Sequence, residues 1–373
     1  MNTSKKHIYF FDFLRIFAAF GVVYMHTAAG ILRESVNFDW ELINVLTSLA
    51  FTAVPLFFMM SGYLLLSSER TKDISVLLKK RLPRLIVPLA AWTVVAVLLN
   101  CYRLGQLNIS GIASGLLSAL SEPAAVHFWF LYTLIAMYAL SPLLYGAINS
   151  LDKKGHIYVL SIIALVTLQV MLTAVLPESM HKAVNIDVIA KLKFFGGNLC
   201  SFILGYYLGH CEKRLPNKIL LPAAVILLAV IAFGTHSLTV RNGEFTDTFL
   251  NQSAGFEVLL ASCIFLLFKQ NLNRPSRLTE LFPAVNLLMG IYLMHNLLIS
   301  LFASKIRAYN CFDTIWLTAA NFAICYLAVK TAASIKPLCY IVNGISFEDA
   351  CASCNWQYTF KRIREARNER IHT

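Results

Sequence analysis

Charged residues are scarce in this chain of 373 residues. Asp, Glu, Lys and Arg together make up only 14% of the sequence, whereas hydrophobic residues make up 58% and the mean hydropathy is +0.64. Soluble domains carry about a quarter of their residues as charged side chains. The composition therefore excludes an ordinary soluble fold and indicates a membrane protein.

The signatures of several common enzyme classes are missing as well. The sequence has no Gly-rich phosphate loop, no metalloprotease motif and no nucleophile elbow. Its nine cysteines are scattered, and Cys351-x-x-Cys354 has neither a second pair nor a nearby histidine. We therefore expect reduced thiols and no metal site.

Long apolar runs are what the chain has in abundance. A helix needs about 20 residues to cross a hydrocarbon core of about 30 Å. Short polar connectors separate ten such runs, at 8–32, 41–66, 85–101, 125–148, 157–176, 194–210, 219–238, 255–268, 285–303 and 313–333. We predict an all-α fold, a polytopic transmembrane bundle of about ten helices, with a membrane domain at 1–343 and a basic tail at 344–373.

Positive charge alternates between successive connectors. Lys and Arg concentrate at Lys5, Lys6, Arg70 to Arg84, Lys153, Lys154, Lys213, Arg214, Lys218, Lys269, Arg274, Arg277 and Lys336 to Arg370. Because Lys and Arg are retained on the cytoplasmic side of a membrane, both termini are predicted to be cytoplasmic. This asymmetry explains the net charge of +12 without a nucleic-acid partner.

The first apolar run contains two ionisable residues, Arg15 and His26. Eleven helical steps leave the two side chains about 20° apart around the axis and about 16 Å apart along it. Asp12, one turn before Arg15, is the expected partner of the guanidinium group. Ionisable groups at membrane depth are costly to bury, so the pair is a candidate functional site.

A second basic group precedes the third run. Arg81 and Arg84 are three residues apart, which would place them on one face of a helix. Guanidinium groups match phosphate oxygens, so a phosphate-binding role is one interpretation. The other interpretation is that they set the membrane topology or contact lipid headgroups.

Histidines and aromatic residues mark the fourth and ninth runs. The candidate residues are His127, Trp129, Tyr132, Tyr292, His295 and Asn296. A low dielectric favours neutral imidazole, which can accept a proton or attack an acyl carbon. The structural alternatives are interhelical hydrogen bonds for the histidines and a membrane-interface position for the aromatic residues.

In their order and spacing, these motifs resemble the acyltransferase 3 family. The resemblance rests on the Arg-x10-His pair, the stretch Phe57 to Leu64, the Arg81 and Arg84 stretch, His127-Phe-Trp-Phe-Leu and Tyr-Leu-Met-His295. It implies a multi-pass enzyme of the bacterial inner membrane. Such an enzyme moves an acyl group, here expected to be acetyl, from cytoplasmic acyl-CoA to a hydroxyl of an extracytoplasmic or lipid-linked glycan. Some members carry an appended hydrolase-like domain, and this chain is expected to act without one.

The resemblance also implies roles for the candidate residues. Acyl-CoA would be a co-substrate rather than a permanently bound cofactor, with its phosphates on Arg81 and Arg84. Arg15 and His26 would be the catalytic residues, and Arg15 is a further candidate for phosphate binding. His26 would act either as general base or as acyl-accepting nucleophile, and these alternatives stay open. The candidates for acceptor binding or oxyanion stabilisation are His127, Trp129, Tyr132, Tyr292, His295 and Asn296.

Two other classes of protein stay open. A transporter or flippase of an anionic or lipid-linked glycan would also bury Arg and His, although we find no internal repeat. A non-catalytic scaffold would act through the basic run Lys361 to Arg367, lying on an anionic leaflet. That interpretation leaves Arg15 and His26 unexplained. The sequence indicates neither the acceptor nor the oligomeric state.

Overall fold

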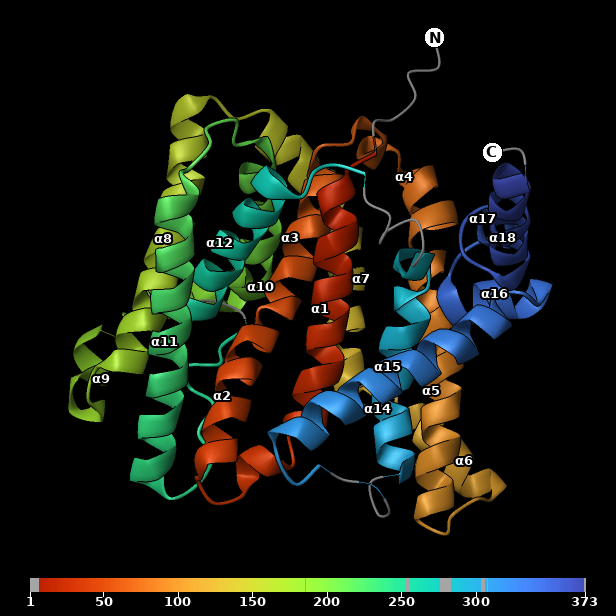
Figure 1. The fold of residues 1–373 in the computed structure, drawn as a ribbon. Coiled ribbons are helices and arrows are strands. Elements are labelled where there is room, and N and C mark those ends of the chain that lie inside the picture. The colour runs from red at the N-terminus through yellow and green to blue at the C-terminus, as the bar shows by residue number, and fades with distance from the viewer. Residues whose placement is uncertain are drawn as a thin grey trace. The chain divides into compact units, whose positions relative to one another are not determined.

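The computed structural model describes residues 7–184, 186–252, 255–275, 283–302, 306 and 308–371. Within these residues every regular element is a helix (Figure 1). The predicted all-α fold is therefore confirmed. Lys5, Lys6 and Arg277 of the predicted charge pattern lie outside the described residues.

Among the described residues, seven helical stretches are long and apolar enough to cross a membrane. They are Tyr9–Ala28, Phe38–Leu66, Ile74–Arg103, Val126–Asn149, Lys153–Val175, Asn217–Asn242 and Cys311–Ala332. The other three predicted runs contain α10 (Asp187–His210), α12 (Phe256–Asn271) and α14 (Leu288–Phe302), of which the last two have only 16 and 15 residues. Each of the ten predicted runs thus contains a helix, and the side of the membrane on which the termini lie stays a prediction.

The chain forms two compact units. Unit 1 comprises residues 1–74, 140–275 and 308–315, and unit 2 comprises residues 75–139, 276–307 and 316–373. Each unit therefore combines segments that are far apart in the sequence. The predicted boundary between residues 343 and 344 stays a prediction.

Unit 1 is built from the first helices of the chain and those of its middle part. They are α1 (Tyr9–Ala28), η1 (Ile31–Arg33), α2 (Phe38–Phe51), α3 (Ala53–Leu66), η2 (Glu69–Lys72), α8 (Lys153–Val175), α9 (Glu178–Val184), α10, α11 (Asn217–Asn242) and α12. Helices α2 and α8 begin with N-cap side chains. The Asn37 side chain accepts a hydrogen bond from the N–H of Trp40 at 2.9 Å, and the Asp152 side chain accepts one from the N–H of Gly155 at 2.8 Å. Gly243, with a φ of 72°, ends α11 in the left-handed conformation.

Glycines bring α3 and α10 into close contact. A methyl group on Gly62 would lie 1.7 Å from the backbone oxygen of Phe202, and one on Gly205 would lie 2.0 Å from that of Met59. Gly209, four residues after Gly205, lies against the ring of Tyr63 in the same way. Small residues at this spacing let two membrane helices approach until their backbones touch. Side chains at positions 62 and 205 would therefore force the helices apart.

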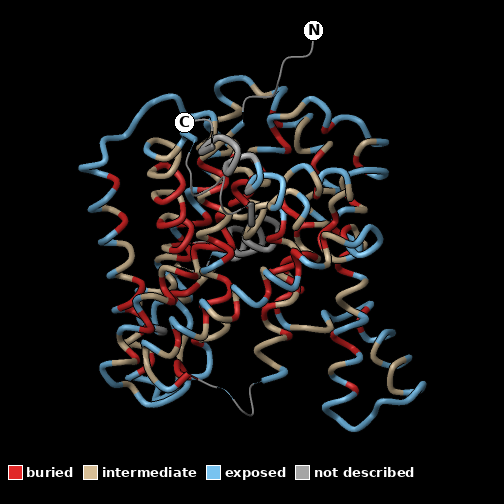
Figure 2. The backbone as a smooth tube through the Cα atoms, turned by 45° about the vertical axis from the view of Figure 1, so that its right-hand side comes forward, coloured by how far each residue is buried: buried red, intermediate tan, exposed pale blue. Residues whose placement is uncertain are grey.

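Aromatic side chains fill the core of unit 1. The ring of Phe11 in α1 lies 5.4 Å from that of Tyr63 in α3 and 6.0 Å from that of Phe265 in α12. Trp40 and Phe58 are also fully buried. In Figure 2 the buried stretches alternate with exposed ones along the helices, and the connectors are largely exposed. The helices of unit 1 thus bury one side against their neighbours.

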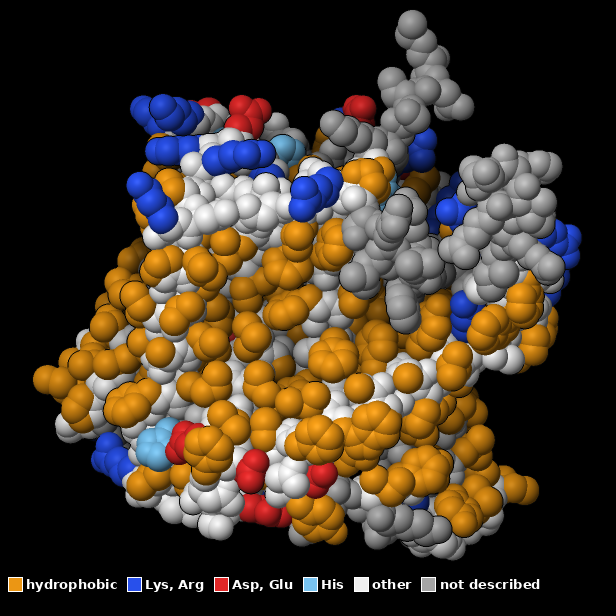
Figure 3. Space-filling model, in the orientation of Figure 1, with side chains coloured by type: hydrophobic (Ala, Val, Ile, Leu, Met, Phe, Trp, Pro, Cys, Tyr) orange, Lys and Arg blue, Asp and Glu red, His pale blue; other side chains and the backbone are white. Residues whose placement is uncertain are grey.

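Most basic side chains of unit 1 gather at one end of its helices. Apolar side chains cover the helix sides on the face drawn in Figure 3, and Lys and Arg collect above them. The exposed cations near the starts of α8 and α11 are Lys153, Lys154, Lys213, Arg214 and Lys218. An apolar belt with cations at one end is typical of membrane-spanning helices. That this end faces the cytoplasm stays a prediction.

Unit 2 contains the remaining helices. They are η3 (Leu77–Arg81), α5 (Pro83–Arg103), α6 (Ile109–Ser118), η4 (Val126–Phe128), the first half of α7 (Trp129–Asn149), η5 (Pro283–Asn286), α14, most of α15 (Cys311–Ala332), α16 (Lys336–Asn343), α17 (Phe347–Ser353) and α18 (Trp356–Ile371); the short α4 (Ile74–Val76) precedes η3. Helix α16 packs against α5 and α14. The ammonium group of Lys330 lies 4.4 Å from the centre of the Trp356 ring, a cation–π contact that joins α18 to α15.

Candidate active site

The predicted site residues are divided between the two units. Arg15 and His26 belong to unit 1, and the other eight belong to unit 2. Helix α1 is unbroken from Tyr9 to Ala28, so Arg15 and His26 share one side of it, about 16 Å apart along the axis. Both residues are half-buried, and the guanidinium carbon of Arg15 lies 5.9 Å from the centre of the Phe11 ring.

The expected partner of Arg15 has a contact with another residue. The carboxylate of Asp12 lies 2.6 Å from Nε2 of His7, and the Asp12–Arg15 pair stays a prediction. Ile8, just before the helix, is not helical. The chain before α1 can therefore fold back, and the His7 ring reaches the carboxylate in the first turn.

A compact polar cluster lies inside unit 2, where η4 meets α14. His127 and His295 are 2% and 0% exposed, and their ring centres are 4.9 Å apart. Nε2 of His127 lies 3.1 Å from the carbonyl oxygen of Leu293, and its Nδ1 lies 3.3 Å from Nδ2 of Asn296. The hydroxyl of Tyr292 donates to the carbonyl oxygen of His127. The structure thus brings His127 together with three predicted residues, Tyr292, His295 and Asn296, that follow it by 165 to 169 positions.

These hydrogen bonds assign the protons of both imidazole rings. A carbonyl oxygen can only accept, so His127 carries its proton on Nε2 and accepts the Asn296 amide with Nδ1. Nδ1 of His295 lies 2.5 Å from the carbonyl oxygen of Tyr292 and must be its donor. The lone pair of neutral His295 is then on Nε2. His127 uses both nitrogens to bind α14, whereas His295 keeps a basic nitrogen.

Both predicted tyrosines donate their hydroxyl protons to backbone carbonyl oxygens of unit 2. Tyr132 donates to the carbonyl oxygen of Ala119 at 2.9 Å, and Tyr292 donates to His127 as described above. Trp129 is half-buried, with its ring centre 6.4 Å from that of Phe130. Sequence reasoning missed Asn321 of α15, which donates to the carbonyl oxygen of His295 at 3.1 Å. These contacts fix the helices around the histidine pair.

Arg81 and Arg84 flank the start of α5. Residues 77–81 form a π-helical turn in which the N–H of Leu82 reaches the carbonyl oxygen of Leu77 at 2.9 Å. Pro83 explains the wider turn, because its ring would clash with the carbonyl four residues earlier in a regular helix. Arg84 is exposed and Arg81 is half-buried.

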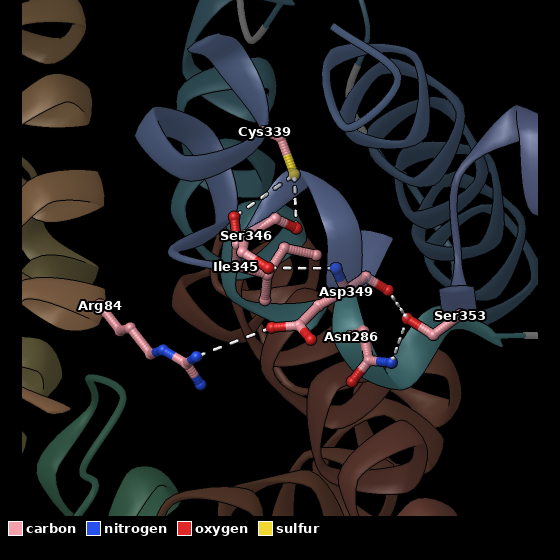
Figure 4. A network of polar contacts seen from close by, with 7 residues as sticks. All are labelled: Arg84, Asn286, Cys339, Ile345, Ser346, Asp349 and Ser353. Atoms are coloured by element: carbon pink, nitrogen blue, oxygen red, sulfur yellow. Dashed lines mark hydrogen bonds and ion pairs between the residues drawn. The ribbon is translucent and has the colours of Figure 1, made fainter. Parts of the chain in front are cut away.

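Arg84 belongs to a polar network with the C-terminal helices (Figure 4). Its Nη2 lies 3.7 Å from Oδ2 of Asp349, and the Asp349 N–H donates to the hydroxyl of Ser346. The thiol of Cys339 donates to the carbonyl oxygens of Ile345 and Ser346. Burial raises the pKa of the Cys339 thiol to about 12, so it stays protonated and can donate. Nothing in the sequence around Arg84 pointed to Asp349, which is far away along the chain.

No metal centre is built by the described part of the chain. Within it, no group of three or more His, Cys, Asp or Glu side chains could hold an ion. The nine cysteines are all free thiols. The polar groups described here could bind anions and move protons.

Comparison with known proteins gives one match. The acyltransferase 3 family model, described as an acyltransferase domain, matches residues 8–330. The match covers nearly all of the helices described above and ends before α16. Searches of the curated proteins and of the solved structures found no match.

Proposed function

We propose that this chain, which belongs to the acyltransferase 3 family, transfers an acyl group from acyl-CoA to a hydroxyl group of a glycan. The observation that carries the proposal is the family match over residues 8–330, which indicates a membrane acyltransferase. The seven long apolar helices agree with this role. Donor, acceptor and residue roles are parts of the proposal.

The donor would be bound through its phosphates. Arg84 exposes a guanidinium group at the start of α5, and Arg81 lies in the π-helical turn just before it. Guanidinium forks bind phosphate oxygens through two parallel hydrogen bonds. Arg15 of α1 is the third proposed phosphate ligand. Binding from the cytoplasm follows from the predicted topology.

His26 is the proposed catalytic group. As general base it takes the proton of the acceptor hydroxyl while the oxygen attacks the thioester carbonyl. The tetrahedral intermediate then collapses, the C–S bond breaks, and the imidazolium returns the proton to the thiolate. The products are the ester and free CoA. In the alternative route the neutral imidazole of His26 attacks the thioester carbonyl, and the C–S bond breaks to release CoA thiolate and leave an acyl-imidazole. The acceptor hydroxyl then attacks this group, the C–N bond breaks to release the ester, and the hydroxyl proton passes to the thiolate.

The cluster of unit 2 supplies candidates for stabilising the oxyanion. A donor aimed at the developing charge contributes about 3 kcal/mol. The hydroxyls of Tyr132 and Tyr292 already donate to backbone carbonyls, which favours a structural role for both. Asn296 has a second amide N–H besides the one directed at His127. Protonated His295 could donate from Nε2, so Asn296 and His295 are the stronger candidates.

The proposed acceptor is an extracytoplasmic or lipid-linked glycan, and acetyl is the proposed acyl group. Both follow from the family resemblance, as does placement in the bacterial inner membrane. Among family members, the one we propose as most similar is the O-acetyltransferase of enterobacterial common antigen. That similarity is our reason for expecting a lipid-linked surface sugar.

The test is acyl transfer by purified protein in lipid nanodiscs. Wild type supplied with acetyl-CoA and extracted lipid-linked glycan should release CoA in proportion to the acetyl ester formed. His26→Ala should lower the rate at least about 100-fold at equal abundance. His181→Ala, a histidine of α9 in the same unit, is the matched control and should keep the wild-type rate. Near-normal transfer by the His26 variant would refute the assignment, and glycan transport without CoA release would favour a flippase.

A further inference from the structure

Asn343 is a buried carboxamide without hydrogen bonds. It is the last residue of α16, it is 3% exposed, and neither its Oδ1 nor its Nδ2 has a partner. An orphaned polar group of this kind carries a substantial desolvation penalty and calls for an explanation. Asn343 also lies beyond residues 8–330, the part matched by the family.

The surroundings of Asn343 hold it firmly in place. A methyl group on Gly290 of α14 would lie 2.4 Å from Oδ1 of Asn343, so the carboxamide rests directly on that helix. The next residue, Gly344, has a φ of 67°, and a methyl group on it would lie 2.0 Å from the carbonyl oxygen of Arg84. The indole N–H of Trp92 donates to the carbonyl oxygen of Val342 at 3.3 Å. The end of α16 is therefore fixed against both α5 and α14.

This position lies near two groups of the proposed site, all within unit 2. Arg84 touches the residue after it, because Gly344 lies against the Arg84 carbonyl group. His295 is five residues after Gly290, about 8 Å farther along α14 and about 140° around its axis.

Acyl-CoA carries a group complementary to each of these residues. Its phosphates are followed by the pantetheine arm with two secondary amides, and the thioester comes last. A secondary amide offers one N–H and one carbonyl oxygen, which point in opposite directions because the amide is trans. A carboxamide side chain can accept from the N–H or donate to the carbonyl oxygen of such an amide.

We propose that Asn343 binds a secondary amide of the pantetheine arm of the donor. The inference rests on the proposed function, because it takes acyl-CoA as the donor. It assigns a binding residue to α16, a helix outside the matched family domain. In the unliganded protein the carboxamide is an unsatisfied polar group, and the donor amide supplies a hydrogen-bond partner to one of its two ends.

The test separates the arm from the phosphates. Binding of CoA and of adenosine 3′,5′-bisphosphate, which has phosphates but no arm, is measured by calorimetry on detergent-purified protein. Asn343→Leu should weaken CoA binding about tenfold and leave the bisphosphate unchanged. Arg84→Gln should weaken both ligands. Asn286→Leu, an exposed asparagine of unit 2 bonded to Ser353, is the matched control and should change neither.

A thermal melt of each variant checks the fold. Asn343→Leu removes an unsatisfied polar group, so the unliganded variant should be as stable as wild type or more stable. If the leucine side chain does not fit this buried position and the variant fails to fold, Asn343→Ala replaces it in the binding measurements. Unchanged CoA binding by a folded variant, or equal weakening of both ligands, would overturn the proposal. Failure of the proposed function is distinguishable, because wild type itself would then bind no CoA and release none from acetyl-CoA.

Discussion

Two helix contacts, one inside each unit, are made in opposite ways. In unit 1, α3 and α10 meet through Gly62 and Gly205, each lying against the backbone of the other helix. In unit 2, η4 and α14 meet through His127, Tyr292 and Asn296, which exchange directional hydrogen bonds. The first contact depends on shape, and the second depends on the pairing of polar groups.

The difference suggests a division of labour. A glycine contact brings no titratable group into the interior, so it can hold helices but cannot move protons. A histidine contact places imidazole in an apolar interior, where its protonation responds to its surroundings. The η4–α14 contact therefore places titratable groups in the interior of unit 2, whereas the α3–α10 contact serves only as scaffold. The first two predictions below each remove one element of these contacts, and the last two concern weaker polar contacts in the same units.

The largest effect is expected from the glycine contact. Gly62→Ala places a methyl group 1.7 Å from the Phe202 oxygen, so the helices must separate and the fold should lose at least about 3 kcal/mol. Gly146→Ala is the matched control, because a methyl group there meets nothing within 4 Å. Yield after gel filtration and thermal unfolding in detergent measure both. Equal stability of the two variants would show that α3 and α10 are not held this way.

The histidine contact should be the next most sensitive. His127→Ala removes two hydrogen bonds and leaves the Leu293 carbonyl and the Asn296 amide buried without this partner. The expected loss is about 2 to 3 kcal/mol of unfolding free energy, measured by thermal unfolding. Val126→Ala, at the exposed neighbouring position, should change little. A stable His127 variant that had lost activity would instead indicate a direct part in catalysis.

Much of the fold and part of the candidate site could be predicted from the sequence. Hydropathy located the ten helical runs, and the eleven-residue spacing placed Arg15 and His26 on one side of α1. Histidines within apolar runs marked the cluster of unit 2. These features were predictable because they depend on helical periodicity and on the cost of burying polar groups.

What was missed depends mostly on contacts between distant segments. Asp349 and Gly344 reach Arg84 at the start of α5 from the other end of the chain. One missed contact is local: Asp12 lies against His7, five residues earlier, because the chain before α1 leaves the helix, which periodicity cannot show. The spacing Gly205-x-x-x-Gly209 was a readable signal for close helix packing, but it did not name α3 as the partner.

A smaller effect is expected at the end of α10. The ammonium group of Lys269 donates hydrogen bonds to the carbonyl oxygens of Leu208, Gly209 and Cys211 at 2.6 to 2.9 Å. These carbonyls end the helix and have no intrahelical partners. Lys269→Met should therefore cost about 1 to 2 kcal/mol in thermal unfolding, and the exposed Lys154→Met should cost nothing measurable. An unchanged melting temperature would mean that the three hydrogen bonds of Lys269 do not stabilise the end of α10.

The smallest effect is expected from Asp349, whose polar contact differs from that of His127 in being exposed. The Arg84 and Asp349 side chains are 54% and 62% exposed and 3.7 Å apart, so the ion pair should contribute less than about 1 kcal/mol. Asp349→Asn should leave the melting temperature unchanged. Removing a negative charge beside Arg84 should tighten CoA binding about twofold at low salt, and 0.5 M NaCl should abolish the gain because salt screens exposed charges. A marked loss of stability would instead mean that this network, like the histidine cluster, holds unit 2 together.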